Sequence, residues 1–445
     1  MQKPELLWRK GPNYAADAVV IANDKVCLIK RKSGMWALPG GFVDDGEDSL
    51  DAAKREALEE TSLVLQTSGQ LVFSGKVEDP RNSETRWIES DAYVFFTDQQ
   101  PVTAADDAQD ADWFSLDNLP ELYGSHKTMV ENALAFRKQQ ELRRQLETST
   151  LTETRGGHMG YDYLLAESDA GKLFIKHHND SHFTDSHKAN HSRMYLKKEL
   201  NTSRHLRRQQ FRHLPNQHHL FDEVTLVMEA LAEDDGWHWR LPRAEHRERY
   251  ITDILKALSN LELVPYDKVV ELEGIKPSIE SMYEEGWKAL SDPLKRQKVV
   301  QKMRSVQSRL SPASQLQAPK LIAELEAGIP TVNIPPLDAL THFSHHDARQ
   351  ANIAWHPAEG VKIVDWSWAG KGLPKADTTS FLIDLKKSGH DVRPYVKQYF
   401  NPEYALLLIG FWLGHSIWPT RTDDDTVRLH QVASALSAYE LLGEV

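Results

Sequence analysis

The chain has 445 residues, of which 40% are hydrophobic and 27% are charged, with one cysteine and a formal net charge of -12 at pH 7. Compact cores usually divide beyond roughly 250–300 residues, so the length predicts two domains. The acidic balance argues against a nucleic-acid partner, and the single Cys27 excludes an intrachain disulfide and a multi-cysteine zinc site.

Strand-like and helical segments alternate in the first third of the chain. The N-terminus begins Met1-Gln2-Lys3-Pro4-Glu5 and lacks the apolar core of a secretion signal. A glycine pair, Gly40 and Gly41, opens a loop ahead of a helix. The spacing of apolar residues predicts strands over 15–22, 26–31, 71–77 and 90–96, and helices over 49–61 and 127–146.

The predicted helix over 49–61 carries three glutamates on one exposed face. Glu56, Glu59 and Glu60 stand at positions i, i+3 and i+4. Each like-charged pair costs about a few tenths of a kcal/mol, and a bound divalent cation reverses the sign of that energy. Carboxylate oxygens are hard ligands that suit Mg²⁺ or Mn²⁺. The spacing therefore indicates a metal site, with a solvated acidic helix face as the alternative.

Neighbouring residues support the interpretation as a metal site. Glu47 lies just ahead of the helix and can supply another oxygen. Arg55 can pair with a helix carboxylate and hold it in place. Gly41 lets the loop backbone approach a ligand closely.

The whole segment resembles the Nudix box. That motif is a glycine, five residues, Glu, seven residues, then Arg-Glu-apolar-x-Glu-Glu-x-Gly-apolar. Ser62 stands where the family has glycine, and a serine that leaves the helix with positive φ is expected to cost roughly 1 kcal/mol. The segments 36–43 and 111–120 are also similar to ADP-ribose pyrophosphatases. The matching positions are Gly41, Glu47, Arg55, Glu56, Glu59 and Glu60.

The resemblance implies an α/β/α sandwich with a mixed sheet, in a domain over residues 1–148. It also implies that water attacks a phosphorus of a pyrophosphate. Glu56, Glu59 and Glu60 would bind the metal, and Glu56, Glu59 or a later loop glutamate would be the catalytic base. The implied substrate is ADP-ribose or a similar small-molecule nucleotide, cut to AMP and a sugar phosphate. A homodimer formed through this domain is also expected.

A second domain is expected over residues 149–445. The polar segment 147–154 follows a charged helix, so we expect a partly helical linker there. A hairpin is predicted over 161–176, followed by helices, a mixed segment over 340–369, and helices to the end. The apolar stretch 405–418 is too short to span a bilayer and is expected to be a buried helix. We therefore expect a cytoplasmic protein with no membrane partner.

Polar residues in the mixed segment suggest phosphoryl transfer. Asp347 can orient an alcohol and take its proton. Asn352 and Asp365 can hold Mg²⁺ against the phosphates of ATP. The alternative is a polar turn between buried strands, but Asp365 ends an apolar run, which favours a functional role.

These residues resemble the catalytic loop of aminoglycoside phosphotransferases, whose form is His-Gly-Asp-x-x-x-x-Asn. His346 replaces the family's glycine. The resemblance implies an α+β, bilobal, protein-kinase-like domain with a small lobe at about 153–232 and a large lobe at about 233–445. Asp347 would be the catalytic base, with Asn352 and Asp365 as metal ligands and ATP as phosphate donor.

The small lobe of such a domain should bind the nucleotide. Lys176 fits a phosphate-binding lysine, and Glu199 could pair with it from a helix. Met228 lies in the expected hinge strand, where adenine would bind. The loop 155–160 could cover the phosphates.

The sequence therefore predicts a bifunctional enzyme. The first domain would be a Mg²⁺-dependent pyrophosphatase, and the second would phosphorylate a small hydroxylated metabolite. Two alternatives remain open: a pyrophosphatase regulated by a nucleotide-binding pseudokinase, and a non-catalytic nucleotide sensor.

Overall fold

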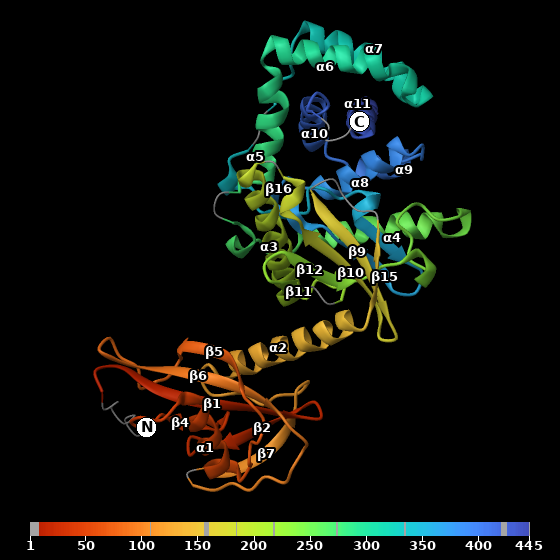
Figure 1. Cartoon of the computed structure of the whole chain (residues 1–445). Coiled ribbons are helices and arrows are strands. Elements are labelled where there is room, and N and C mark those ends of the chain that lie inside the picture. Colours follow the sequence, from red (N-terminus) through yellow and green to blue (C-terminus); the bar gives the residue numbers. More distant parts are fainter. Residues whose placement is uncertain are drawn as a thin grey trace. The chain divides into compact units, whose positions relative to one another are not determined.

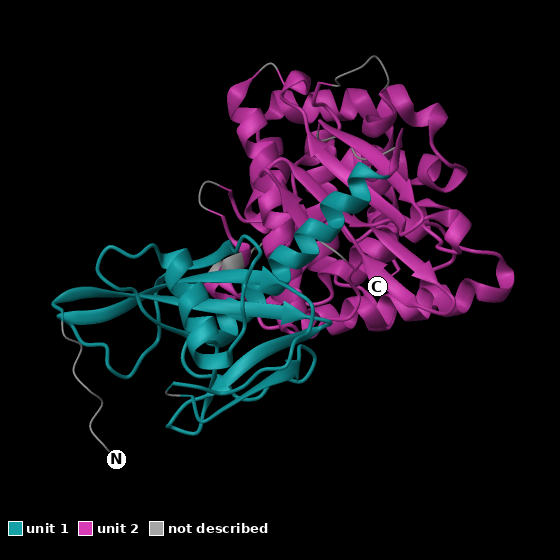
Figure 2. Ribbon diagram, turned by 60° about the horizontal axis from the view of Figure 1, so that its bottom comes forward, with its two compact units in different colours: residues 1–148 teal, residues 149–445 magenta. Residues whose placement is uncertain are grey.

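The computed structural model describes residues 9–106, 108–154, 160–183, 185–216, 219–272, 275–332, 335–419 and 425–444. The chain divides into unit 1, Met1–Thr148, and unit 2, Ser149–Val445 (Figure 2). Within the described ranges, no helix combines the length and the apolar character that a membrane crossing requires.

Unit 1 is built on a mixed sheet, as predicted. Its main path runs β3-β2-β1-β6-β5, with β4 paired to β1 and β7 paired to β2. β1 and β6 are parallel, and the other pairs are antiparallel. The strands are β1 (Gly11–Ala22), β2 (Lys25–Lys30), β3 (Trp36–Ala37), β4 (Gly40–Phe42), β5 (Gln70–Lys76), β6 (Arg86–Phe96) and β7 (Asp110–Ser115).

Two helices, α1 (Ser49–Thr61) and α2 (His126–Glu147), cover the two faces of this sheet (Figure 1). Successive side chains of a strand point to opposite faces. Val19 and Ile21 of β1 accordingly pack in a cluster with α2, while Ala18 and Val20 pack in another with α1. The two clusters form the predicted α/β/α sandwich.

The ends of α1 agree with the prediction from the sequence. The Asp48 side chain accepts a hydrogen bond from the Leu50 amide and caps the first turn. Ser62 ends the helix at φ 62°, in the left-handed region where the related motif has glycine.

Unit 2 begins with an antiparallel sheet in the order β11-β12-β10-β9-β8. The helix α3 (Ser186–Arg208) packs on it through Leu196, which contacts Leu226 and Met228. Residues 150–153 form an edge strand, so the expected partly helical linker is wrong there. The strands are β8 (Thr150–Glu153), β9 (Tyr161–Ser168), β10 (Gly171–His178), β11 (His219–Phe221) and β12 (Thr225–Glu229).

The remainder of unit 2 is mainly helical around one large core. Two two-stranded sheets, β13-β16 and β14-β15, interrupt the helices in and just after the predicted mixed segment. α10 is largely buried in this core, as its apolar sequence predicts. The helices are α4 (Ala244–Glu262), α5 (Ser278–Tyr283), α6 (Pro293–Val306), α7 (Pro312–Ala327), α8 (Ala376–Lys387), α9 (Arg393–Tyr399), α10 (Pro402–His415) and α11 (Thr426–Leu442). The short strands are β13 (His342–Ser344), β14 (Ile353–His356), β15 (Gly360–Ile363) and β16 (Gly370–Gly372). Short helical turns are η1 (Asp180–His182), η2 (Glu233–Asp235), η3 (Lys268–Val270), η4 (Glu284–Lys288), η5 (Gln307–Arg309), η6 (Leu337–Ala339), η7 (Gln350–Asn352) and η8 (Trp366–Trp368).

Candidate active sites

The three glutamates of α1 lie in different environments. The side chain of Glu56 is 13% exposed and that of Glu59 is 46% exposed. Glu60 is only 4% exposed, because it turns toward the sheet. The expectation that all three share an exposed face is therefore wrong for Glu60. Its Oε2 accepts a hydrogen bond of 2.9 Å from the Gly40 amide, which ties α1 to the glycine loop.

Arg55 connects most of the acidic groups of unit 1's site. Its Nε lies 2.9 Å from Oε1 of Glu47, and its Nη1 lies 2.7 Å from Oε1 of Glu56 and 3.1 Å from Oε2 of Glu59. Nη2 donates to the Phe42 carbonyl at 3.1 Å. One guanidinium thus fixes the loop, the glutamate ahead of the helix and two helix carboxylates.

The site shifts the pKa values of two carboxyl groups in opposite directions. Burial raises the pKa of Glu56, and the hydrogen bond from Arg55 only partly opposes this. The hydrogen bond from Arg55 lowers the pKa of Glu47. The ionised form of Glu56 is therefore less favourable than that of Glu47, and a neighbouring cation would stabilise the charge of Glu56 more.

The glycines of the loop are required by close contacts. A Cβ on Gly41 would overlap with the carboxylate of Glu56, and one on Gly40 would overlap with Oδ1 of Asp17. The backbone of β4 therefore lies directly against acidic side chains. The role of Gly41 in close approach follows from this packing.

A buried group beneath the loop was missed at the level of sequence. Asp17, 7% exposed, accepts a 2.5 Å hydrogen bond from Ser90. His126 accepts the Leu38 amide proton at Nδ1, at 2.9 Å. Burial lowers the pKa of His126, so the ring is neutral, although its Nδ1 lies 3.8 Å from Asp17. A single acidic residue within the apolar strand 15–22 was the available signal.

The donor set of α1 fits a hard divalent cation. Among the residues that the structure describes, however, no cluster of three His, Cys, Asp or Glu side chains is already arranged as metal ligands. The three glutamates of α1 are instead held by other contacts, since Arg55 binds Glu56 and Glu59 and the Gly40 amide binds Glu60. All three offer carboxylate oxygens, and the missing Cβ of Gly41 leaves the space that the Glu56 carboxylate occupies.

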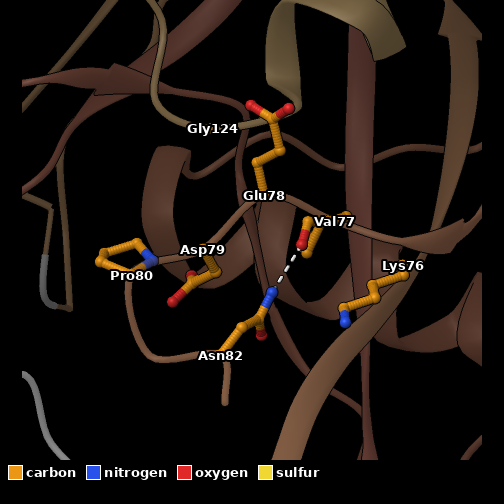
Figure 3. A pocket seen from close by; sticks show the side chains of 7 residues that line it. All are labelled: Lys76, Val77, Glu78, Asp79, Pro80, Asn82 and Gly124. Atoms are coloured by element: carbon orange, nitrogen blue, oxygen red, sulfur yellow. Dashed lines mark hydrogen bonds between the residues drawn. The ribbon is translucent and has the colours of Figure 1, made fainter. Parts of the chain in front are cut away.

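An open hollow of about 610 Å³ lies along the segment that follows β5. Figure 3 shows the side chains around it, with the Asn82 amide reaching back to the Val77 carbonyl at 2.7 Å. The same segment carries Arg81, whose guanidinium lies 5.4 Å from the ring of Phe42 in β4. The segment that lines the hollow thus contacts β4 through Arg81. Its lining residues are Lys76, Val77, Glu78, Asp79, Pro80, Asn82 and Gly124.

In unit 2, residues far apart in the sequence meet at Lys176. Its Nζ lies 3.0 Å from Oε2 of Glu199 and 3.2 Å from Oδ1 of Asp365. Burial alone would lower the pKa of Lys176, but Asp365 and Glu199 together raise it well above its usual value. Burial would raise the pKa of Asp365, but Lys176 and a hydrogen bond from Ser367 lower it to about 2. Lys176 and Asp365 are therefore both charged.

The predicted catalytic turn brings Asp347 and Asn352 together. Nδ2 of Asn352 donates to Oδ2 of Asp347 at 2.8 Å, and Arg349 pairs with Oδ1 at 3.0 Å. The side chains of Asp347 and Asp365 are 34% and 33% exposed, so both carboxylates are accessible to a ligand. Burial raises the pKa of Asp347, which is the direction that suits a proton acceptor.

Two residues of this region have left-handed backbone conformations. His346 has φ 65° and Asp365 has φ 63°. His346 therefore makes the turn for which the related motif uses glycine. Its backbone amide and that of His345 donate to the Asp377 carboxylate at 2.9 and 2.8 Å, which holds the turn in place. Strained non-glycine residues of this kind cluster at functional sites.

The structure gives different results for the other residues predicted to bind the nucleotide. Met228 is 3% exposed and packs in the core cluster with Leu196 and Leu226. Its side chain therefore serves packing, and the expected hinge role stays a prediction. The loop residues 155–159 lie outside the described residues.

Comparisons with known proteins match unit 1. The NUDIX domain family matches residues 11–133. An ADP-ribose pyrophosphatase of Methanocaldococcus jannaschii is 34% identical over 131 residues, covering 28% of this chain and 75% of that protein. A putative nudix hydrolase 6 of Caenorhabditis elegans is 33% identical, covering 28% of this chain and 56% of that protein. The mitochondrial ADP-ribose pyrophosphatase of Rattus norvegicus is 31% identical, covering 28% of this chain and 48% of that protein.

Proposed function

Because the chain belongs to the Nudix family through its N-terminal unit, we propose that unit 1 hydrolyses the pyrophosphate of ADP-ribose or a similar nucleoside diphosphate-linked metabolite. The products would be AMP and a sugar phosphate. The observation that carries the proposal is the acidic set on α1, in which Arg55 holds Glu56 and Glu59 and the Gly40 amide holds Glu60.

A divalent cation would neutralise the charge that develops on the pyrophosphate oxygens. Glu56, Glu59 and Glu60 would hold it, because they supply the hard oxygens of the site. Arg55 keeps Glu56 and Glu59 beside the glycine loop until a cation competes for them. The Gly40 amide fixes the remaining carboxylate, Glu60.

The chain's own residues would also handle the proton of the attacking water. The water oxygen forms a bond to phosphorus as the bridging P–O bond breaks, and one proton passes to a carboxylate. Glu56 suits this role, because it is sheltered from solvent and burial raises its pKa. The hollow beside Arg81 would hold part of the substrate away from the cleaved bond.

The test is release of AMP from ADP-ribose by the full chain with Mg²⁺ or Mn²⁺. Glu56→Gln should abolish release, since it removes both a metal ligand and the proton acceptor. Binding of ADP-ribose without any AMP, at each metal and pH, would instead support a nucleotide sensor.

We also propose that unit 2 transfers the γ-phosphate of ATP to a small hydroxylated metabolite. The specific observation is the meeting of Lys176, Glu199 and Asp365. Lys176 would bind ATP phosphates, oriented by Glu199. Asp347 would take the proton of the acceptor hydroxyl as that oxygen bonds to the γ-phosphorus and ADP leaves.

ATP consumption with a panel of hydroxylated metabolites tests this second proposal. Asp347→Asn should reduce consumption by at least about 100-fold, because it removes a general base. Unchanged consumption in that variant would contradict the assignment. ATP binding without consumption would support a regulatory pseudokinase.

A further inference from the structure

A small cavity of about 280 Å³ lies in unit 2, separate from the residues proposed to carry out phosphoryl transfer. It is enclosed by α3, η3, the start of α5 and β16. Such a volume admits a small metabolite rather than a nucleotide-sized ligand. Its polar lining residues include Lys198, Tyr266, Glu271, Lys276, Ser278 and Lys371.

Lys198 is the unusual member of this lining. It is 4% exposed, and no residue that the structure describes gives its ammonium group a hydrogen bond or an ion pair. Burial lowers its pKa to about 8, and Glu271 opposes this only in part. A buried lysine without a counter-ion is costly, so a site of this kind favours an anionic ligand.

The other charged groups of the lining already have partners. Lys276 pairs with Glu284, and Lys371 lies 5.4 Å from the ring of Tyr266. The Glu271 carboxylate accepts a 2.6 Å hydrogen bond from the Tyr266 hydroxyl. Lys198 is therefore the charged residue of the lining that is left to meet a ligand.

We propose that this cavity binds a small phosphomonoester or inorganic phosphate, with Lys198 as its principal ligand. A phosphomonoester carries about -1.5 to -2 charge near neutral pH, which complements a buried ammonium group. The ammonium groups of Lys276 and Lys371 lie in the same lining and have protons to donate to the phosphate oxygens, whereas the Ser278 hydroxyl already donates to the Trp368 carbonyl at 2.6 Å. The site does not depend on the phosphotransferase assignment, because it needs neither ATP nor Asp347.

The cavity is also connected to the predicted catalytic turn. The Lys371 carbonyl accepts a 2.8 Å hydrogen bond from Nε2 of His346, and burial lowers the pKa of that ring to about 4, so the ring is neutral. β16 pairs with β13, which leads directly into the turn. Lys198 also precedes Glu199 on α3. A bound phosphate would therefore hold both α3 and β16.

The test measures binding of inorganic phosphate and ribose 5-phosphate to the full chain by calorimetry, with EDTA present and ATP absent. Lys198→Met should weaken binding by about tenfold or more, because a charge-assisted hydrogen bond is lost. Lys197→Met is the matched control, since it removes the same charge from an exposed neighbour on α3. Its affinity should equal that of the native chain.

Further outcomes decide the proposal. Binding of ribose 5-phosphate alone identifies a sugar phosphate as the ligand, whereas equal binding of both probes identifies the phosphate group. Ligand-induced protection from hydrogen exchange in α3 and β16 supports the site, and protection elsewhere overturns it. If Lys198→Met does not fold, Lys371→Met should show the same loss. Absence of binding to the native chain, or equal binding to Lys198→Met, overturns the proposal.

Discussion

Gly40 and Glu60 are joined by a 2.9 Å hydrogen bond from the backbone amide of one to the carboxylate of the other. This contact places the most buried glutamate of α1 under the loop that precedes the helix. Glu60 thus has two roles, because the same side chain positions the loop and offers an oxygen to a cation. The two roles can be separated by an amide substitution.

Glu60→Gln should reduce ADP-ribose hydrolysis by about 10- to 100-fold or more, because the loss of even an outer partner of a metal ligand has an effect of that size. The amide oxygen can still accept from Gly40, so the melting temperature should change little. Activity and thermal unfolding of the full chain measure the two effects. Asp51→Asn, on an exposed part of α1, is the control and should keep full activity.

Ser62→Gly should stabilise unit 1 by up to about 1 kcal/mol, because Ser62 has φ 62° and glycine adopts this conformation without strain. The melting temperature should rise by a few degrees, with hydrolysis unchanged. Ser62→Ala should not produce the gain, since alanine has the same steric restriction. A loss of activity in Ser62→Gly would mean that the serine side chain has a role beyond its backbone.

Glu199→Gln should destabilise unit 2, because it leaves the buried Lys176 with Asp365 alone. Removing one partner of a buried ion pair costs about 3–5 kcal/mol, and the remaining carboxylate should keep the loss at the lower end. Denaturant unfolding measures the change. Glu326→Gln, which breaks an exposed pair with Arg304, should cost less than about 1 kcal/mol.

A double-mutant cycle provides the sharper measurement. If Lys176 and Glu199 stabilise each other, Lys176→Met with Glu199→Gln should cost less than the sum of the single changes. Additive losses would show that the ion pair contributes little in solution.

Local sequence patterns predicted the elements of unit 1 well. α1 was predicted over its observed span, because apolar spacing and both ends of the helix are local features. β8 was missed, because residues 150–153 are exposed at the edge of the sheet and lack the apolar alternation of a half-buried strand, although they pair with the next strand, β9. Its alternating Thr150 and Thr152 were the available signal.

In the candidate sites, too, the features that depend on local sequence were predicted and those that depend on tertiary packing were not. Residue types at fixed spacing identified Arg55 with its glutamates, and Asp347 with Asn352, all of which are near one another in sequence. The burial of individual side chains could not be predicted from residue types and spacing. Glu60 and Lys198 are buried by tertiary packing, and the helical period alone does not separate such positions from exposed neighbours.

Acidification should weaken unit 1 through His126, which lies under the loop of the acidic site. Burial lowers the pKa of His126 below its ordinary value of 6.5, while its Nδ1 accepts the Leu38 amide proton. Between these two pKa values the unfolded chain binds a proton that the folded chain does not. The free energy of unfolding therefore falls as pH falls through 6.5 toward the lowered pKa, and the contribution is fully present above 6.5.

His126→Asn should remove this dependence, because the amide oxygen can accept from Leu38 and does not titrate. The measurement is the hydrogen-exchange protection factor of peptides that contain Leu38, taken across the acid range in both chains. The native chain should lose protection below pH 6.5, and the variant should lose less. Parallel loss in the two chains would assign the acid sensitivity to other groups, since every other titrating residue is the same in both.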